Sequence, residues 1–300
     1  MQKSNLKALQ LLILPFIFGS ILFWSLNQNI YVYFIGQFFG IIFFIQCFIL
    51  IHEFGHNSLF KTTQLNLIFG KIISFFVFIP FDNWRLIHEL HHKWTGWRDR
   101  DPTTEKTFIN RLSPFQKKIV DFSWKYHIPL FTLGYRFGIY WKIEKLKRFL
   151  SKEEFQTCLY SMGRMIFVYS IILFYFSNWF LLLLPSLLIS FIFTDIISLS
   201  QHSNIEIPNS NGAEVLPIKY QEQAKYSRSL IFSPFISKYI LFYFNFHEAH
   251  HCYPGLPCYF LPQIKHSSGQ SYHFYKWVKK AKSLKGSEFI FTESKNRKDY

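Results

Sequence analysis

The sequence contains few cysteines and no glycine-rich nucleotide motif. Its four cysteines form no Cys-x-x-Cys pair, and we expect them to be reduced thiols with packing roles: Cys47, Cys158, Cys252 and Cys258. No Gly-x-Gly-x-x-Gly segment is present, so the chain shows no sign of a dinucleotide-binding fold for a flavin or a nicotinamide. Electrons for any redox chemistry would therefore have to come from another protein.

Lysine and arginine are absent from two long stretches, residues 8–60 and 165–218, although the whole chain has a formal net charge of +15. Each stretch holds two apolar runs separated by a short polar break. A bilayer core of about 30 Å is crossed by about 20 apolar residues in a helix. We therefore expect two helical hairpins that make four membrane spans. The expected spans are residues 8–26, 30–51, 159–177 and 179–199.

The distribution of charge predicts the orientation of these spans. The hairpin tips lack basic residues, and the positive-inside rule places both termini and the middle segment in the cytoplasm. The predicted fold class is all-α integral membrane, with one domain over residues 1–300 and a cytosolic helical cap formed by 52–158 and 200–300. The dispersed basic residues suit a lipid bilayer and argue against nucleic acid. The membrane would be the plasma or inner membrane in a bacterium and the endoplasmic reticulum in a eukaryote.

Histidine is concentrated in a recurring pattern. Nine of the twelve histidines form three short boxes and one isolated position. Imidazole is the commonest biological metal ligand, and spacings of three and four residues place rings on one face of a helix. Eight box histidines are too many for one tetrahedral zinc, so the sequence predicts a site with more than one metal. The metal-ligand candidates are His52, His56, His88, His91, His92, His202, His247, His250 and His251.

The predicted topology brings these histidines to one side of the membrane. His52 directly follows the second span, and His202 follows the fourth. The second box follows the apolar run Leu67–Phe81, which is too short to span and is expected to be an interfacial or re-entrant helix. The third box follows an amphipathic run, Leu230–Phe246. The hydrophilic connector Ile205–Arg228 is typical of an irregular loop.

Other polar residues near the boxes have less specific patterns. Asn245 lies two residues before His247 and is a candidate weak or water-mediated ligand, or a helix cap. His127, His266 and His273 stand alone and are expected to be structural or surface residues.

One segment permits a different interpretation. The residues from His52 to His56 form a literal His-Glu-x-x-His motif, in which Glu53 would be the general base of a zinc protease. In a membrane chain this resembles the site-2-type intramembrane metalloproteases, but their Leu-Asp-Gly motif is missing and the other two boxes would have no role. A non-enzymatic metal carrier is a further alternative, although transporters usually place ligands near the bilayer midplane.

The three boxes, their order and their flanking residues resemble the membrane fatty acid desaturase superfamily. The resemblance rests on His52–Phe60, on His88–Pro102 with its trailing Asp-Pro, and on Asn245–Pro254 with its trailing proline. It implies four transmembrane helices under a cytosolic helical cap that holds two irons, with His202 as the additional family histidine after the fourth span. The implied activity is the O2-dependent introduction of a cis double bond into a fatty acyl chain.

The same resemblance implies partners and leaves alternatives. The substrate would be an acyl lipid or a thioester, and a separate ferredoxin or cytochrome b5 would donate electrons, because no His-Pro-Gly-Gly segment indicates a fused cytochrome b5. A di-iron hydroxylase or ketolase acting on a lipid, an alkane or a carotenoid would share the fold and the metals. The three residues between the histidines of the first box favour the acyl-lipid branch or the hydroxylases over acyl-CoA desaturases.

Acidic residues are candidates for orienting the imidazoles. Asp195 precedes His202 by two helical turns on the same face, and ionisable residues inside membranes usually face a functional interior. Asp82, Asp99 and Asp101 are further candidates. The glutamates that follow the first histidine of each box point about 100° away from it and are expected to orient ligands or to cap helices; they are Glu53, Glu89 and Glu248.

Three residues before the second box, Asn83, Trp84 and Arg85, are candidate contacts for a headgroup or thioester, or anchors at the membrane interface.

Overall fold

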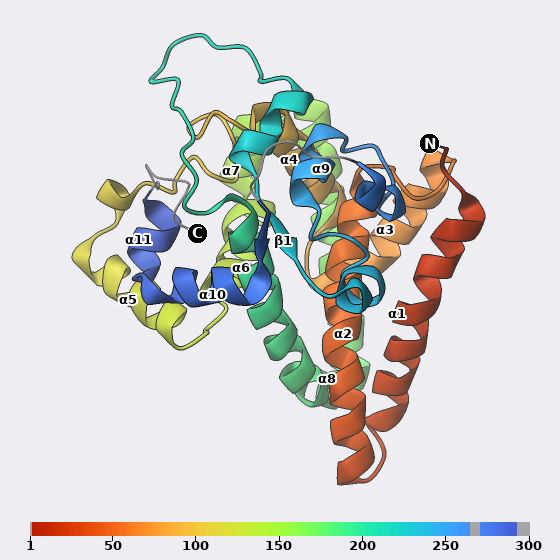
Figure 1. Ribbon diagram of the computed structural model, residues 1–300. Helices are drawn as coiled ribbons and strands as arrows, with labels where there is room; N and C mark the ends of the chain where they lie inside the picture. Colours follow the sequence, from red (N-terminus) through yellow and green to blue (C-terminus); the bar gives the residue numbers. More distant parts are fainter. Residues whose placement is uncertain (1, 265–270, 293–300) are drawn as a thin grey trace.

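The computed structural model describes residues 2–264 and 271–292, and the predicted surface residue His266 lies outside them. The fold is predominantly helical (Figure 1). The α-helices are α1 Asn5–Ser25, α2 Ile30–Gly55, α3 Thr63–Val77, α4 Phe81–Trp94, α5 Pro114–Lys125, α6 Leu130–Tyr135, α7 Ile143–Phe149, α8 Lys152–His202, α9 His247–Cys252, α10 Phe274–Ser283 and α11 Gly286–Phe291. The short 3-10 or π segments are η1 Ile109–Arg111, η2 Arg136–Tyr140, η3 Tyr220–Tyr226, η4 Ile236–Ile240 and η5 Cys258–Gln263.

The described chain also contains a small parallel sheet, in which β1 (Ser229–Ile231) pairs with β2 (Ser271–His273). The described residues are mostly helical, as predicted, and this short sheet is a feature that the sequence analysis did not predict. The strand β1 and the π turn η4 divide the amphipathic run Leu230–Phe246, and Phe242 and Tyr243 have positive φ angles of 46° and 63°. These left-handed residues prevent a continuous helix before the third box.

The first hairpin agrees closely with its apolar pattern. Helices α1 and α2 lie side by side and project away from the rest of the molecule (Figure 1). Asn29 ends the connection between them and caps α2, because its side-chain oxygen accepts the backbone N–H groups of Tyr31 and Val32 at 3.2 Å. Helix α2 continues to Gly55, one turn beyond the expected end, so His52 lies within the helix.

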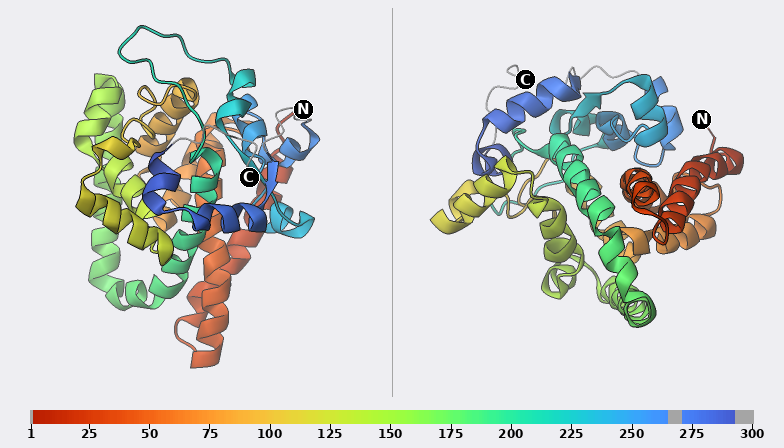
Figure 2. Two further views of the ribbon diagram at one scale, coloured as in Figure 1. Left: turned by 60° about the vertical axis from the view of Figure 1, so that its left-hand side comes forward. Right: turned by 90° about the horizontal axis from the view of Figure 1, so that it is seen from below.

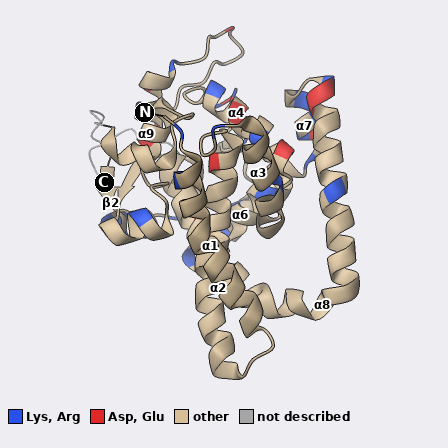
Figure 3. Ribbon diagram, turned by 90° about the vertical axis from the view of Figure 1, so that its right-hand side faces the viewer, with Lys and Arg blue, Asp and Glu red and all other residues tan. Residues whose placement is uncertain are grey.

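Helix α8 covers both arms of the second expected hairpin. It is assigned as one helix with a bend at Phe176, whose φ of −134° and ψ of 33° are not helical. Both arms extend from the bend towards the same end of the molecule (Figures 2 and 3). The bend lies next to the expected polar break between 159–177 and 179–199, and the chain turns there without leaving the assigned helix. Each arm is about 36 Å long at 1.5 Å per residue.

Helices α3 and α4 form a bent pair at the position of the expected interfacial or re-entrant segment. Their axes differ by 100°. Phe78 ends α3 in the left-handed conformation with φ 58°, and Pro80 precedes α4. The exposed carbonyls at the end of α3 are satisfied by side chains, since Arg136 Nε donates to Val77 O at 2.8 Å and Trp141 Nε1 donates to Phe78 O at 2.9 Å. These bonds fix the direction of α4 relative to α3.

The apolar surface of the hairpins is unusual for a soluble protein. Among the described helices, α1, α2 and α8 are long and apolar enough to cross a membrane. They expose large side chains such as Phe16 (75% exposed) and Phe174 (79% exposed). Continuous exposed apolar surface of this kind is typical of lipid contact. All four cysteines are free and buried, as expected.

Close helix contact at Gly40 generates a prediction. A Cβ atom on Gly40 of α2 would lie 2.7 Å from Leu22 Cδ1 of α1 and 2.9 Å from Ser186 Cβ of α8. Gly40→Ala should therefore destabilise the protein by about 1–3 kcal/mol, because Ser186 Cβ cannot move without its helix. Thermal unfolding in detergent measures this effect. Gly163→Ala is the matched control, since that glycine lies in a helix with nothing within 4 Å, and equal melting temperatures for the two variants would contradict the prediction.

Candidate metal centre

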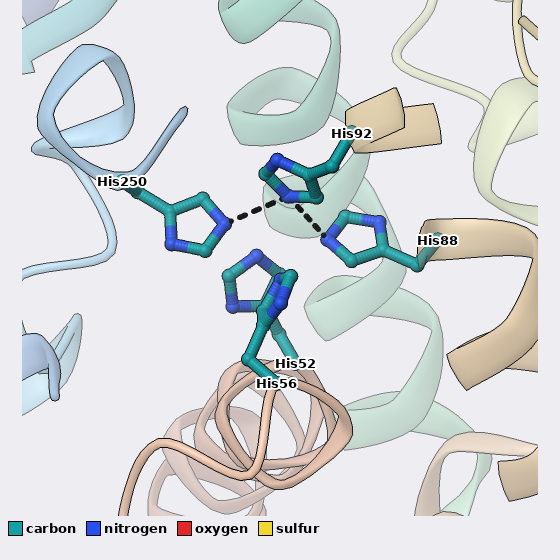
Figure 4. A group of neighbouring side chains, drawn as sticks. All are labelled: His52, His56, His88, His92 and His250. Carbon is teal, nitrogen blue, oxygen red and sulfur yellow. Dashed lines mark hydrogen bonds between the residues drawn. The ribbon is translucent and has the colours of Figure 1, made fainter. Parts of the chain in front are cut away.

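Five imidazoles from three helices converge in a first group, called group one here (Figure 4). The end of α2 provides His52 and His56, α4 provides His88 and His92, and α9 provides His250. One ring nitrogen of each lies within 4.8 Å of the others. His92 Nε2 is 3.1 Å from His88 Nε2 and 3.0 Å from His250 Nε2. Segments nearly 200 residues apart in sequence therefore meet at one point.

Four further imidazoles form group two. His91 comes from α4, His202 from the end of α8, and His247 and His251 from α9. The Nε2 atom of His202 lies 3.2 Å from that of His91, 2.8 Å from that of His247 and 3.2 Å from that of His251. The two groups adjoin, since the ring centroids of His92 and His251 are 4.3 Å apart.

Hydrogen bonds at Nδ1 orient three of the group-two rings. His91 Nδ1 lies 2.7 Å from Asp101 Oδ2, and His202 Nδ1 lies 3.0 Å from the Tyr226 carbonyl oxygen. His251 Nδ1 lies 3.1 Å from Gln223 Oε1, and the amide of Gln223 is fixed because its Nε2 donates to His92 O at 2.7 Å. Each of these acceptors requires a proton on Nδ1. The Nε2 atoms therefore carry lone pairs.

Facing lone pairs at these distances repel each other unless a cation lies between them. Such lone pairs face each other at 3.2 Å between His202 and His91 and between His202 and His251, and four further Nε2–Nε2 separations across both groups fall between 2.8 and 3.1 Å. Metal–nitrogen bonds of about 2.1 Å at right angles place two ligand atoms about 3.0 Å apart. In group one, His52 Nε2 and His56 Nε2 are buried without a hydrogen-bond partner. The donor set and its spacing therefore fit metal ions.

The electrostatics keep the rings available as ligands. Burial, followed by repulsion between neighbouring rings, holds the pKa of five histidines well below the ordinary value: His88, His92, His247, His250 and His251. These imidazoles are neutral at neutral pH, which is the form that binds metal. Burial raises the pKa of Asp101, but the opposing effects of His91 and Thr103 hold it below its usual value, so this carboxylate remains an acceptor.

A cavity opens beside both groups. His52 and His88 of group one, and His91, His202 and His247 of group two, line the same space. Its apolar lining comes from Phe48, Ile79, Trp84, Phe131, Leu199 and Phe244. Tyr135, Arg136 and Asp195 add polar groups to the lining. A ligand in this cavity would contact mostly apolar surface and would face both histidine groups.

Comparison with known proteins agrees with this geometry. The family model described as "Fatty acid desaturase" matches residues 28–280. The chain belongs to the fatty acid desaturase family. Relatives in this family include a "Probable fatty acid desaturase DES1" from Sorghum bicolor, which is 39% identical over 90 residues, 29% of this chain and 23% of the relative.

Two further relatives carry more specific names. An "sn-2 acyl-lipid omega-3 desaturase (ferredoxin), chloroplastic" from Helianthus annuus is 35% identical over 65 residues, 20% of this chain and 15% of the relative. An "Acyl-lipid omega-3 desaturase (cytochrome b5), endoplasmic reticulum" from Arabidopsis thaliana is 29% identical over 92 residues, 29% of this chain and 22% of the relative. The matched segments thus span less than a quarter of the length of these relatives.

Only some of the residues that orient the box histidines and His202 were identified from the sequence. Asp195 accepts the backbone N–H of Thr132 and so caps the start of α6, while His202 is oriented by the Tyr226 carbonyl. The expectation that Asp195 positions His202 was therefore wrong, although Asp195 lines the cavity. Asp101 does contact a box histidine. Gln223 was missed, because it lies in a connector without helical periodicity or a motif.

Asn245 has a structural role. Its side-chain oxygen accepts Ser237 Oγ at 2.7 Å, and its Nδ2 donates to Leu230 O at 2.8 Å. These bonds join η4 to β1 just before the third box, so we do not propose Asn245 as a ligand. His127 and His273 are exposed and belong to neither group.

The three box glutamates have different environments. Glu53 is buried, and its Oε2 accepts Ser58 Oγ at 2.8 Å and Cys258 N at 3.1 Å, while its Oε1 lies 3.3 Å from His52 Nδ1. Glu248 is buried and accepts Ser271 Oγ at 3.4 Å. Glu89 is largely exposed and lies 4.0 Å from Arg85, which does not support a ligand-orienting role.

The residues before the second box face inwards more than expected. Asn83 is fully buried and donates to Tyr140 O at 2.8 Å, and Trp84 stacks on His88 with ring centroids 4.3 Å apart. Neither is placed to hold a headgroup at the surface. Arg85 is only partly buried, beside Glu89.

The Asp101–His91 bond generates a prediction for metal retention. Asp101→Asn should weaken metal binding by about 10- to 100-fold, because an amide can donate to Nδ1 and so move the imidazole proton onto Nε2. Elemental analysis of purified protein after dialysis against graded chelator concentrations measures the effect. Asp99→Asn is the control, since Asp99 contacts Ser210 and no box histidine. Equal metal retention by the two variants would refute a role for Asp101.

Proposed function

We propose that this chain is an O2-dependent fatty acid desaturase that introduces a cis double bond into an acyl chain. The observation that carries the proposal is the pair of adjoining histidine groups open to a single, mostly apolar cavity. Membership of the fatty acid desaturase family supports the same reaction class. The reaction consumes the acyl chain, O2, two electrons and two protons, and it yields the alkene and two waters.

The nine histidines would hold two irons, five in group one and four in group two. Bound there, the iron pair would supply the activation of O2 that an unreactive C–H bond requires. The chain itself would keep the imidazoles neutral, hold three of them through Nδ1, and confine the acyl chain between Phe48, Trp84 and Phe244. His91, His202 and His247 of group two line the cavity, so an iron held by this group would adjoin the bound acyl chain.

We further propose that α1, α2 and the two arms of α8 provide four membrane spans. Both hairpin bends then lie at the end of the molecule opposite the histidines (Figures 1 and 3), and basic residues are absent from these bends. Both termini would be cytoplasmic under the positive-inside rule. The metal centre would lie at the cytosolic boundary of the bilayer, where one protein domain can meet both a lipid and a soluble or membrane-bound electron donor.

The substrate and the electron donor are proposed at the level of class. An acyl lipid suits the names of the relatives, and a separate ferredoxin or cytochrome b5 would donate the electrons. The positive charge of the chain would favour an acidic carrier.

The decisive test is the product formed in cells that express the chain. Lipid profiling should reveal a new cis double bond, and His91→Ala or His250→Ala should reduce its yield to about 1% or less, because each removes a ligand from one group. His127→Ala is the matched control and should retain full activity, since this histidine is exposed and isolated. A new hydroxyl group would instead support the hydroxylase alternative, and near-normal turnover by either ligand variant would contradict the assignment.

The protease alternative makes a different prediction for Glu53. Its carboxylate is held by Ser58 and Cys258, lies 3.3 Å from His52 Nδ1 and does not line the cavity, whereas a zinc protease would need it as the general base. Glu53→Gln should lower the free energy of unfolding by about 1–3 kcal/mol and weaken metal retention through His52, while the metal-loaded variant keeps its product yield within about twofold. Thermal unfolding, elemental analysis and lipid profiling measure the three effects. Peptide cleavage by wild type that this variant loses would favour the protease.

A further inference from the structure

A second, smaller cavity lies between α3 and the first arm of α8, apart from the metal centre. Its lining combines two cations and two hydroxyls with three apolar side chains: Lys71, Ser74, Phe75, Phe81, Ser161, Arg164 and Met165. None of these residues lines the cavity beside the histidines. Tyr169 closes the contact between the two helices, because its hydroxyl donates to Phe75 O at 2.5 Å. Figure 3 shows the two helices on the same flank of the molecule.

Lys71 is the only charged residue of α3, and it faces this cavity. Within residues 2–264 and 271–292, no carboxylate lies within ion-pair distance of its amine. Its neighbours Ile68 and Ile72 are about half exposed, so the apolar side of α3 flanks the cavity. A partly buried cation beside exposed apolar surface indicates an anionic partner with an apolar portion.

The α8 side of the cavity adds a second cation and a hydrogen-bond donor. Arg164 pairs with Asp82 at 2.8 Å but remains half exposed, which leaves part of its guanidinium free to contact a ligand. Ser161 Oγ accepts the Asp82 N–H at 3.4 Å, so its hydroxyl proton can be donated into the cavity. With Lys71 counted, the two cations exceed the one carboxylate. The cavity therefore carries net positive charge.

The position of the cavity defines what kind of anion it fits. Arg164 immediately precedes the apolar run that begins at Met165, and beyond it Phe167 and Ile171 are exposed. The cations thus lie where headgroup contacts give way to lipid contacts, and basic pockets between helices at this level bind anionic headgroups. We propose that Lys71, Arg164 and Ser161 bind the phosphate of an anionic phospholipid whose acyl chains lie along α3 and α8. The site rests on the membrane insertion proposed above.

Retention of phosphatidylglycerol by the purified full-length protein tests this site. The protein in detergent is exposed to equal amounts of phosphatidylglycerol and phosphatidylcholine, washed, and analysed for bound lipid by mass spectrometry. Wild type should retain phosphatidylglycerol preferentially, and Lys71→Gln should bind it about fivefold more weakly. Lys71→Arg should restore retention. Lys118→Gln, which removes the same charge from an exposed position of α5, should behave as wild type.

Any other result of the retention experiment would contradict the proposed lipid site. Equal retention by wild type and Lys71→Gln, or equal preference for the two lipids, would show that the cavity does not select an anionic headgroup. Displacement of the lipid by millimolar inorganic phosphate would assign the cavity to a soluble phosphate instead. The test is independent of catalysis: an active chain without bound phosphatidylglycerol would refute only the lipid site, and an inactive chain that retains it through Lys71 would refute only the desaturase.

Discussion

Repulsion between facing imidazole lone pairs is the constraint on which the arrangement of this protein depends. Asp101, Tyr226 and Gln223 each require a proton on Nδ1 of a group-two histidine, so the Nε2 atoms point lone pairs at one another across about 3 Å. Without a cation, this repulsion would act between helices α4, α8 and α9 where their box histidines meet. The proposed metals would therefore be part of the fold as well as of the chemistry, because they would join helices that lie far apart in the sequence.

The spacing of the boxes explains how two histidine groups can form from so few helices. Residues four apart on a helix differ by about 40° in direction, whereas residues three apart differ by about 60° in the opposite sense. On α4, His88 and His92 face group one and His91 faces group two. On α9 the assignment is reversed, since His247 and His251 face group two and His250 faces group one. A His-x-x-His-His box thus contributes to both histidine groups, and the His-x-x-x-His box on α2 contributes to one.

This regularity also shows what the sequence could predict. Helical spacing indicated which histidines share a face, and apolar length indicated where the long helices α1, α2 and α8 lie. Of the three partners at Nδ1, only Asp101 was among the candidates, since Tyr226 contributes a backbone carbonyl and Gln223 lies in an irregular connector, and neither leaves a pattern in a sequence. The prediction that Asp195 orients His202 was wrong because it rested on helical spacing alone. Its spacing from His202 was suitable, but tertiary packing brought an unsatisfied helix start closer to it than any imidazole.

The bend between α3 and α4 links the membrane part of the molecule to the cavity. Arg136 caps the end of α3, contacts Thr132 O, and lies over the ring of Phe191 at 4.2 Å. Burial lowers its pKa to about 10, so it remains a cation at neutral pH although it is almost inaccessible to water. The same guanidinium lies 5.8 Å from the ring centroid of Phe48, so its charge adjoins the apolar lining of the cavity. An acyl chain bound there would bury most of its surface against Phe48, Trp84 and Phe244, and the last two rings lie beside His88 and His52 with centroids 4.3 and 4.9 Å apart.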